Sequence, residues 1–362
     1  MIFRDKKLPQ ISATGVGAMS GTSLDGLDVC LCSFSRKSNK TWKYAIIDAF
    51  TFEYPSNVRE QLENAPKLTG EQLTELDYRY GRWIGTCVKE FLCNSVQKPT
   101  FIASHGHTIF HNPLKGYTLQ IGKGSAIAAE VGIPCISDFR SSDVCRGGQG
   151  APLVPVGDKL LFSHADVCLN LGGIANLSYD NEVYQRIAYD IVPCNMLLNH
   201  LAKIQGLSFD KNGGMGKTGS VNKNLLISLN SLDYYNAVSP KSLGREWFEF
   251  NIIPLLNTSS SPIADQLRTS YEHIAQQITR VTNRIKGNTL MLTGGGTHNA
   301  FLRELIGEKS NKKLIIPDVA TIDFKEALIF AFLGFLYMEN QEGALSTVTG
   351  ANANSICGCL YH

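Results

Sequence analysis

The order of the predicted elements occurs twice along this chain, and that duplication most restricts the folds open to it. In the first half, strands are expected at 11–19, 27–34 and 42–54. A helix follows, in which apolar residues from Leu73 to Phe91 recur at steps of three and four. In the second half, strands at 167–171, 177–179 and 185–191 precede a helix at 195–205. Each half has a glycine or polar turn after its first strand, so the pattern predicts an α/β protein with two related lobes.

The size of the chain agrees with two lobes. Its 362 residues correspond to about two domains of roughly 150 residues. We place the first lobe at residues 1–137 and 345–362, and the second at 138–344. With 43% hydrophobic and 18% charged residues, the composition excludes a disordered chain and a coiled-coil rod.

Charge and hydropathy exclude further classes of protein. The net charge of +2 offers no broad attraction for nucleic acid or an anionic membrane. The longest apolar run, 327–338, is too short to cross a bilayer, and no signal-peptide core follows the amino terminus. We therefore expect a cytoplasmic protein. Its ten cysteines include no CxxC pair, so we interpret them as buried thiols rather than metal ligands or disulfides.

Three glycine-rich turns follow predicted strands, at 20–28 (SGTSLDGLD), 172–176 (GGIAN) and 294–299 (GGGTHN). Without a Cβ atom, glycine lets backbone N–H groups approach a phosphate closely. A single turn of this kind more often only reverses the chain, but three in a two-lobed pattern indicate a nucleotide site. Two standard phosphate motifs are excluded. Gly216 to Thr218 lacks the first glycine of a Walker A loop, and GGGTHN lacks the last glycine of the dinucleotide fingerprint.

Carboxylates close to these turns could serve phosphoryl transfer. Such a reaction needs Mg²⁺ to screen phosphate charge and a base for the attacking oxygen. Asp25 and Asp28 suit the metal, and Asp190 suits the base. The alternative is structural: Asp25 and Asp28 would bond their own turn, and Asp190 would cap the next helix. The local sequence leaves both interpretations open.

Histidines and arginines give weaker signals. The H-G-H-T segment reads as a turn, so His107 and His111 do not form a helical zinc pair. His105 in that segment is a candidate substrate contact or a structural turn residue. Arg140 and Arg245 are candidates for a fixed guanidinium, although Arg245 could equally form a structural salt bridge.

Seven motifs in order resemble the anhydro-N-acetylmuramic acid kinases. They are MSGTSLDGLD, SHGHT, TLQIG, SDFRSSDVCRGGQGAPLVP, NLGGIANLS, PKSLGRE and TGGGTHN. The resemblance runs from Gly17 to about Gly350. It implies a two-lobed, actin-like sugar-kinase fold with a duplicated ribonuclease H-like core and ATP between the lobes. It also implies a homodimer that acts in peptidoglycan recycling. These enzymes use water to open the 1,6-anhydro bridge of the sugar and phosphorylate its six-hydroxyl, giving N-acetylmuramic acid 6-phosphate and ADP.

The resemblance also implies roles for individual residues. Asp190 would be the base that deprotonates the water. ATP would be held by Gly21, Thr22, Ser23, Leu24, Asp25, Gly26, Leu27 and Asp28, by Gly172 and Gly173, and at its adenosine end by Gly294, Gly295, Gly296 and Asn299. The sugar would be held by His105, Arg140 and Glu326. Asp25 and Asp28 remain the candidates for Mg²⁺.

The chain departs from the family pattern after the proposed base. Family members usually read Asp-Thr-Gly-Pro-Gly-Asn, whereas this chain has Val192 and Cys194 in place of the two glycines. A β-branched residue at positive φ would be strained, so we expect this loop to run differently. His107, Lys123 and Asp158 also replace the glutamine, aspartate and histidine usual at their positions.

Two other classes of protein stay open. One is a binding or regulatory protein with the same body, which holds nucleotide but no longer turns it over. The other is a mechanical ATPase of the actin or chaperone type, although it would leave the SDFR…GGQGAPLVP block unexplained.

Overall fold

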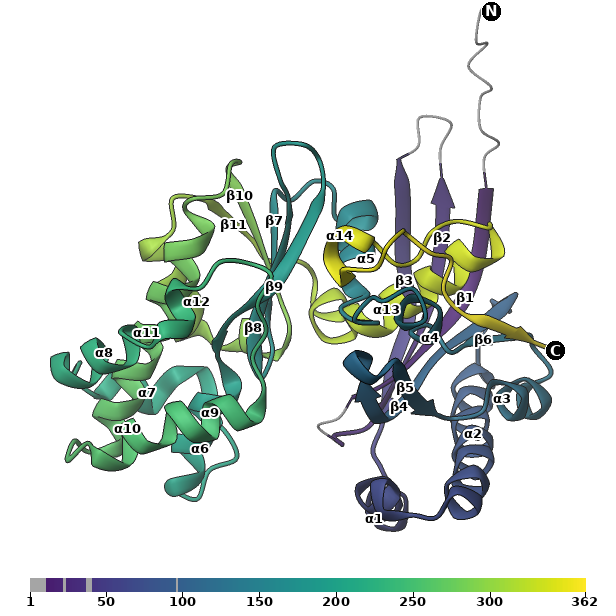
Figure 1. Ribbon diagram of the computed structural model, residues 1–362, viewed down its shortest axis with the longest axis horizontal. Helices are drawn as coiled ribbons and strands as arrows, with labels where there is room; N and C mark the ends of the chain where they lie inside the picture. Colours follow the sequence, from purple (N-terminus) through teal and green to yellow (C-terminus); the bar gives the residue numbers. More distant parts are fainter. Residues whose placement is uncertain (1–10, 22–23, 37–40, 96) are drawn as a thin grey trace, which may run out of the picture. The chain divides into compact units, whose positions relative to one another are not determined.

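The computed structural model describes residues 11–21, 24–36, 41–95 and 97–362 (Figure 1). The chain divides into two compact units, one holding the chain up to Leu161 together with Phe324–His362 and the other Phe162–Asp323. The expected divisions were at 137/138 and 344/345. The observed ones fall at the end of helix α5 (Val154–Leu161) and inside helix α13 (Val319–Met338), where Phe324 is non-helical.

The first unit contains a sheet in the order β12-β6-β4-β1-β2-β3, with β5 paired to β4. Its strands are β1 (Ile11–Ser20), β2 (Leu27–Arg36), β3 (Trp42–Phe52), β4 (Phe101–Asn112), β5 (Tyr117–Ile121), β6 (Cys135–Ser137) and β12 (Cys359–Tyr361). Strands β1, β2 and β3 are antiparallel neighbours, while β4 pairs parallel with β1 and with β6.

The second unit contains a sheet in the order β11-β10-β7-β8-β9. Its strands are β7 (Val167–Leu171), β8 (Ile174–Asp180), β9 (Arg186–Pro193), β10 (Thr289–Thr293) and β11 (Lys313–Ile315). Strands β7, β8 and β9 are antiparallel neighbours, while β10 pairs parallel with β7 and with β11. The order β3-β2-β1-β4-β6 thus has the same pairing directions as β9-β8-β7-β10-β11. The predicted duplication of a two-lobed α/β fold is confirmed at the level of topology.

Helices cover both faces of the first sheet. They are α1 (Ser56–Asn64), η1 (Ala65–Lys67), α2 (Gly70–Leu92), η2 (Pro113–Lys115), α3 (Gly124–Val131), α4 (Ser141–Val144), α5, the later part of α13, and α14 (Ser346–Thr349). The predicted capping box of α2 is present, with Thr69 and Gln72 each bonding the other's backbone N–H. Residues of α2 and α3 share a core with β1, β2 and β4. Phe34 of β2 stacks on Phe335 of α13 with ring centroids 5.7 Å apart, which is why this part of α13 belongs to the first unit.

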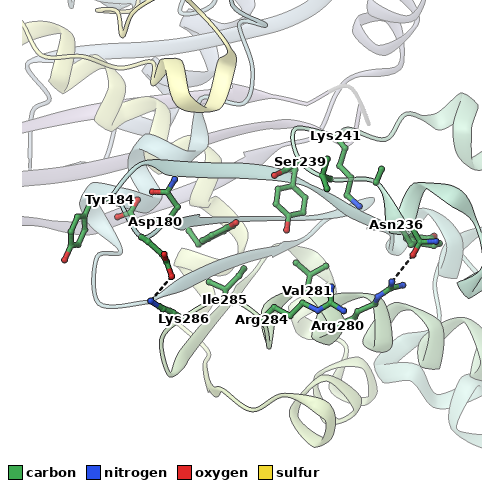
Figure 2. A pocket seen from close by; sticks show the side chains of 17 residues that line it. Asp180, Tyr184, Asn236, Ser239, Lys241, Arg280, Val281, Arg284, Ile285 and Lys286 are labelled. Carbon is green, nitrogen blue, oxygen red and sulfur yellow. Dashed lines mark hydrogen bonds and ion pairs between the residues drawn. The ribbon is translucent and has the colours of Figure 1, made fainter.

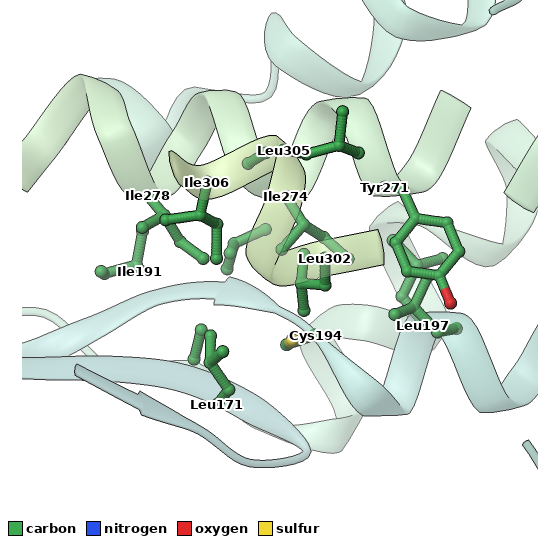
Figure 3. Close-up of a cluster of buried hydrophobic side chains, with 14 of the residues drawn as sticks. Leu171, Ile191, Cys194, Leu197, Tyr271, Ile274, Ile278, Leu302, Leu305 and Ile306 are labelled. Carbon is green, nitrogen blue, oxygen red and sulfur yellow. The ribbon is translucent and has the colours of Figure 1, made fainter. Parts of the chain in front are cut away.

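Helices of the second unit pack on its sheet around one core (Figure 3). They are α6 (Asn195–Ile204), η3 (Lys211–Gly213), α7 (Gly214–Thr218), α8 (Lys223–Asn230), η4 (Asp233–Asn236), α9 (Arg245–Asn251), α10 (Ile253–Thr258), α11 (Ile263–Thr282), η5 (Gly295–His298) and α12 (Ala300–Lys309). Ile274 and Ile278 of α11 share this core with Ile191 of β9. The expected apolar spacing of three and four in α11 therefore marks its buried face.

The two residues that depart from the expected pattern after Asp190 pack into this core. Strand β9 continues through Val192 to Pro193, and the side chains of Val192 and Cys194 are fully buried in the core of the second unit, where Figure 3 labels Cys194. A β-branched residue is favoured in a strand, so Val192 needs no left-handed turn. The chain therefore runs as a strand at Val192, and Cys194 follows the strand directly as the residue that precedes α6.

One local expectation was wrong, and another holds only in part. The H-G-H-T segment is not a turn: β4 runs on through it, with Gly106 at φ +70 beside a shift in register, because β5 supplies a partner for its second half. The cysteines are all free thiols, but Cys93, Cys145 and Cys359 are exposed rather than buried. In the part of the chain that is described, no helix combines the length and the apolar character that a membrane span requires.

Candidate active site

The first glycine turn connects β1 to β2, and its central residues Thr22 and Ser23 lie outside the described residues. Leu24 adopts φ +56, and its N–H donates to the Gly21 carbonyl over 3.3 Å, which forms a tight reversal. A Cβ atom on Gly26 would lie 2.7 Å from the carbonyl oxygen of Phe52. Glycine is therefore required here by the close approach of β3, which is a structural reason in addition to the predicted phosphate contact.

The two candidate metal carboxylates differ in their surroundings. Asp25 is exposed at the turn, while Asp28 is half-buried at the start of β2 and its Oδ1 accepts a 2.6 Å hydrogen bond from Thr51 Oγ1. Among the described residues no group of three or more His, Cys, Asp or Glu side chains could hold a metal ion. Mg²⁺ commonly takes only one or two carboxylates and completes its shell with phosphate oxygens and water. Asp25 and Asp28 fit that donor set, and their metal role stays a prediction.

Buried hydrogen bonds fix the end of β1. Ser20 Oγ lies 2.6 Å from the Tyr54 hydroxyl and 2.9 Å from His107 Nδ1, and the Tyr54 and Tyr80 hydroxyls are 3.0 Å apart. Burial lowers the pKa of His107 to about 4, so its ring is neutral at pH 7. His107 is thus a neutral hydrogen-bonding partner of the strand that leads into the predicted phosphate turn.

His105 and Arg140, two of the predicted sugar ligands, are in direct contact. His105 Nδ1 lies 2.8 Å from the Gly106 carbonyl, which can only accept, so Nδ1 carries the proton. Nε2 then accepts from Arg140 Nε at 3.0 Å and from Nη2 at 2.9 Å. Burial, reinforced by the charge of Arg140, holds the pKa of His105 well below its usual range. A neutral imidazole therefore orients the guanidinium, whose Nη1 donates to the Gly150 carbonyl over 2.7 Å.

Glu326, the third predicted sugar ligand, belongs to the same neighbourhood. The residue is exposed by its accessible surface, but the protein atoms packed around the carboxyl desolvate it and raise its pKa. The charges of Arg140 and Lys325 oppose this rise in pKa, and the charge of Asp28 adds to it. The carboxylates of Glu326 and Asp28 are thus close enough to interact. The first unit brings together the sugar candidates and one metal candidate.

Two parts of this neighbourhood were missed from the sequence. The fully buried Asp143 accepts hydrogen bonds from the Gly150 N–H at 2.7 Å and from Thr349 Oγ1 at 2.8 Å, and so holds the GGQG loop whose carbonyl receives Arg140. Lys325 and Asp158 form a buried ion pair of 2.7 Å beside Glu326. The only sequence signal for Asp143 was its place in the SDFRSSD motif.

Asp190 lies on β9, the edge strand of the second sheet, and the segment 241–243 runs along that edge. The Asp190 N–H donates to the Lys241 carbonyl at 3.3 Å, and its own carbonyl accepts from the Tyr234 hydroxyl at 2.7 Å. Its Oδ2 accepts from the Leu243 N–H at 2.9 Å, whereas no described residue donates a hydrogen bond to Oδ1. Burial raises the pKa of Asp190, and the Leu243 N–H opposes the rise. Asp190 does not cap α6, so the structural interpretation of this residue was wrong.

The second and third glycine turns lie side by side, because β7 and β10 are parallel neighbours that end together, with Thr293 paired to Asn170. A Cβ atom on Gly294, at φ +80, would lie 2.3 Å from Asn170 Oδ1, and one on Gly296 would lie 2.8 Å from the Leu171 carbonyl. Around Gly173, no described atom comes within 4 Å of an added Cβ. The two predicted nucleotide turns therefore meet at the carboxyl ends of parallel strands, where open α/β sheets bind ligands.

Asn299 is engaged in a structural network next to these turns. Its Oδ1 caps α12 by accepting from the Leu302 N–H at 3.1 Å, and its Nδ2 donates to the Tyr271 hydroxyl at 2.7 Å. That hydroxyl in turn donates to Asp210 Oδ2 at 3.1 Å. The Asp210 carboxylate also accepts from the N–H groups of Met215 and Gly216, which explains why the Walker-like GKT is an ordinary helical turn. A direct contact of Asn299 with adenosine stays a prediction.

Arg245 has the structural role that was the alternative for it. It forms a 2.8 Å ion pair with Glu249 one helical turn away, and 78% of its side chain is exposed. An exposed pair of this kind contributes little to stability.

Comparison with known proteins places the chain in a family. It matches the family model "Anhydro-N-acetylmuramic acid kinase" over residues 13–362. It is 35% identical to the anhydro-N-acetylmuramic acid kinase of Pasteurella multocida, covering 96% of each chain. It is 34% identical to the protein of that name from Haemophilus influenzae, covering 96% of this chain and 97% of the relative. Among solved structures, the Plasmodium falciparum glycerol kinase with ADP is 9% identical and aligns over 89% of this chain and 90% of its own, with a TM-score of 0.43. The matches in sequence span nearly the whole chain, and the chain therefore belongs to the anhydro-N-acetylmuramic acid kinase family.

Proposed function

We propose that this protein is an ATP-dependent kinase that opens the 1,6-anhydro ring of anhydro-N-acetylmuramic acid and phosphorylates its six-hydroxyl. Water adds to the anomeric carbon, the bond from that carbon to the bridge oxygen breaks, and the released oxygen takes the γ-phosphoryl group of ATP. The products are N-acetylmuramic acid 6-phosphate and ADP. Membership of the family over residues 13–362 supports this reaction for the whole chain.

The state of Asp190 is the observation that carries the proposal. Its carboxylate is held at Oδ2 by the Leu243 N–H, while Oδ1 accepts nothing from the described residues. Oδ1 would therefore accept the proton of the attacking water. A pKa raised by burial makes the carboxylate a stronger base, and a well-placed general base contributes roughly 10²- to 10⁴-fold in rate.

The contacts in the first unit suit recognition of the sugar. Neutral His105 and the Gly150 carbonyl fix the guanidinium of Arg140, so its charge can meet a polar group of the sugar without rearrangement. Glu326 supplies an acceptor beside it. Asp25 and Asp28 would hold Mg²⁺, which supplies charge screening for the transferred phosphoryl group.

The test is ADP release on addition of anhydro-N-acetylmuramic acid, with mass detection of the phosphorylated sugar. We expect ADP release that depends on the sugar, and a product that has gained one water and one phosphoryl group. ADP release without the sugar would favour a mechanical ATPase instead. Nucleotide binding with no ADP release would favour a binding or regulatory protein.

We expect Arg140→Lys to weaken use of the sugar. The guanidinium of Arg140 bonds His105 Nε2 and the Gly150 carbonyl at the same time. The single ammonium group of lysine lacks the planar set of donors that these two contacts and a sugar contact require together. The KM for the sugar should rise by about tenfold or more, corresponding to about 1.4 kcal/mol. The KM for ATP should stay within about twofold, because the predicted ATP residues are elsewhere. Steady-state kinetics with each substrate varied in turn measures the two KM values. An unchanged KM for the sugar would contradict the assignment of Arg140 to the sugar site.

The family resemblance further supports a homodimer that acts in the cytoplasm. Light scattering coupled to gel filtration would measure its mass, and a mass near 39.7 kDa would indicate a monomer instead.

A further inference from the structure

A cavity of about 730 Å³ opens in the second unit, apart from the glycine turns (Figure 2). Its walls come from the β8–β9 hairpin, the segment 235–241 and the chain from Arg280 to Lys286 at the end of α11. Cavities that bind small molecules commonly have volumes of about 300–1,000 Å³. Its size therefore suits a small organic ligand.

Three cationic side chains at this cavity have no carboxylate partner among the described residues. Lys241 Nζ donates to the Tyr234 carbonyl at 2.9 Å, and Arg280 Nη2 donates to Asn236 Oδ1 at 2.8 Å. The guanidinium of Arg284 bonds no described residue. Figure 2 shows Lys241 on the loop side and both arginines on the α11 side.

Other cations nearby are paired. Lys286 Nζ lies 2.7 Å from Glu182, and Arg186 lies 3.5 Å from Asp180. The two acidic side chains that line the cavity therefore already have basic partners, and the three unpaired cations leave it with a positive charge.

Two of these cations, Lys241 and Arg280, also repel each other. The pKa of Lys241 is lowered first by burial and then by the charge of Arg280. Like charges held near each other are unfavourable unless an anion lies between them. A phosphate monoester has three acceptor oxygens and a charge of about −1.5 to −2 at pH 7, so it can accept from two arginines at once and neutralise more positive charge than a single carboxylate does.

Aromatic rings form the other part of the cavity. Tyr179 and Tyr189 line it from β8 and β9, and Tyr235 lines it from η4. Lys241 Nζ lies 5.9 Å from the centre of the Tyr189 ring, so the cationic and aromatic parts adjoin. Such rings provide flat apolar contact for a ligand that carries a ring of its own.

We propose that this cavity binds a small organic phosphate, with its phosphate among Lys241, Arg280 and Arg284 and its ring on the tyrosines. The occupant would touch the segment that holds Asp190, because the Lys241 carbonyl accepts the Asp190 N–H. Binding should therefore change the rate of sugar turnover. This second part rests on the proposed function, whereas the binding itself does not.

The test uses phenyl phosphate as the probe, with ATP at saturation so that the predicted nucleotide turns are filled. Calorimetry should show one saturable site in the parent protein, and inorganic phosphate or benzoate should bind at least about tenfold more weakly. Arg280→Gln with Arg284→Gln should weaken phenyl phosphate by about tenfold or more. Arg79→Gln, which removes an exposed arginine of the first unit, serves as the matched control and should bind within about twofold of the parent.

Each other outcome counts against the proposal. Parent-like binding by the double variant, or no saturable binding by the parent, would overturn the site. Inorganic phosphate or benzoate binding as tightly as phenyl phosphate would overturn the assignment of the ligand class. Binding with unchanged sugar-dependent ADP release would overturn only the link to Asp190. Both arginines are exposed, so the double variant should unfold at the same temperature as the parent.

Discussion

Asp190→Asn should lower sugar-dependent ADP release by about 10²- to 10⁴-fold, because asparagine cannot accept the proton of the attacking water. Its amide oxygen can still accept from the Leu243 N–H, so the strand and the segment beside it should keep their positions. ATP should bind with the affinity of the parent, as calorimetry would show. Asp233→Asn makes the same chemical change at an exposed acid nearby and should keep turnover within about twofold. Turnover of the Asp190 variant within tenfold of the parent would contradict the assignment of the base.

The raised pKa of Asp190 adds a pH signature to this experiment. Because the ionised carboxylate is the base, kcat should fall as the pH drops through the pKa of Asp190, which lies above that of an ordinary aspartate. The residual activity of Asp190→Asn should lack this acid limb. Burial of the charge also costs folding free energy above that pKa, and the cost disappears once the carboxyl is protonated. The variant should therefore unfold at a temperature no lower than the parent at pH 7, with a difference that shrinks as the pH falls.

The features that could be predicted from the sequence depend on neighbours in the chain. The capping box of Thr69 and Gln72 and the apolar spacing in α11 are local patterns, and both were confirmed. The repeated order of elements predicted the duplicated topology, because the three antiparallel strands in each unit follow one another in the sequence. The boundary between the units was harder to place, since it depends on which sheet the later part of α13 packs against.

The features that could not be predicted depend on contacts between distant residues. Strand β4 continues through H-G-H-T because β5 pairs with it, and a glycine between histidines reads locally as a turn. Asp143 reaches Thr349, which lies 206 positions further along the chain. Val192 was expected to change the course of the chain, but its burial in the core of the second unit depends on residues distant in the sequence and became visible only in the folded chain.

The buried ion pair between Lys325 and Asp158 is the contact whose loss should cost most in stability. The two side chains are only 6% and 5% exposed and lie 2.7 Å apart. Removing one partner takes this ion pair away from the other buried charged group, at a cost of about 3–5 kcal/mol. Lys325→Met should therefore lower the free energy of unfolding by that amount, as urea denaturation would measure.

A double-mutant cycle separates this loss from a simple packing defect. If loss of this ion pair causes the destabilisation, adding Asp158→Leu to Lys325→Met should recover most of the stability, since a buried pair and an apolar replacement of similar volume are often equally stable. Lys89→Met removes an exposed lysine paired with Glu130 at 3.7 Å and should cost less than about 1 kcal/mol. A loss that persists in full in the double variant would instead place the cost in the packing of the lysine stem. The charge of Lys325 also opposes the rise in the pKa of Glu326. Lys325→Met should therefore raise this pKa further and change the KM for the sugar, even under conditions where the variant is fully folded.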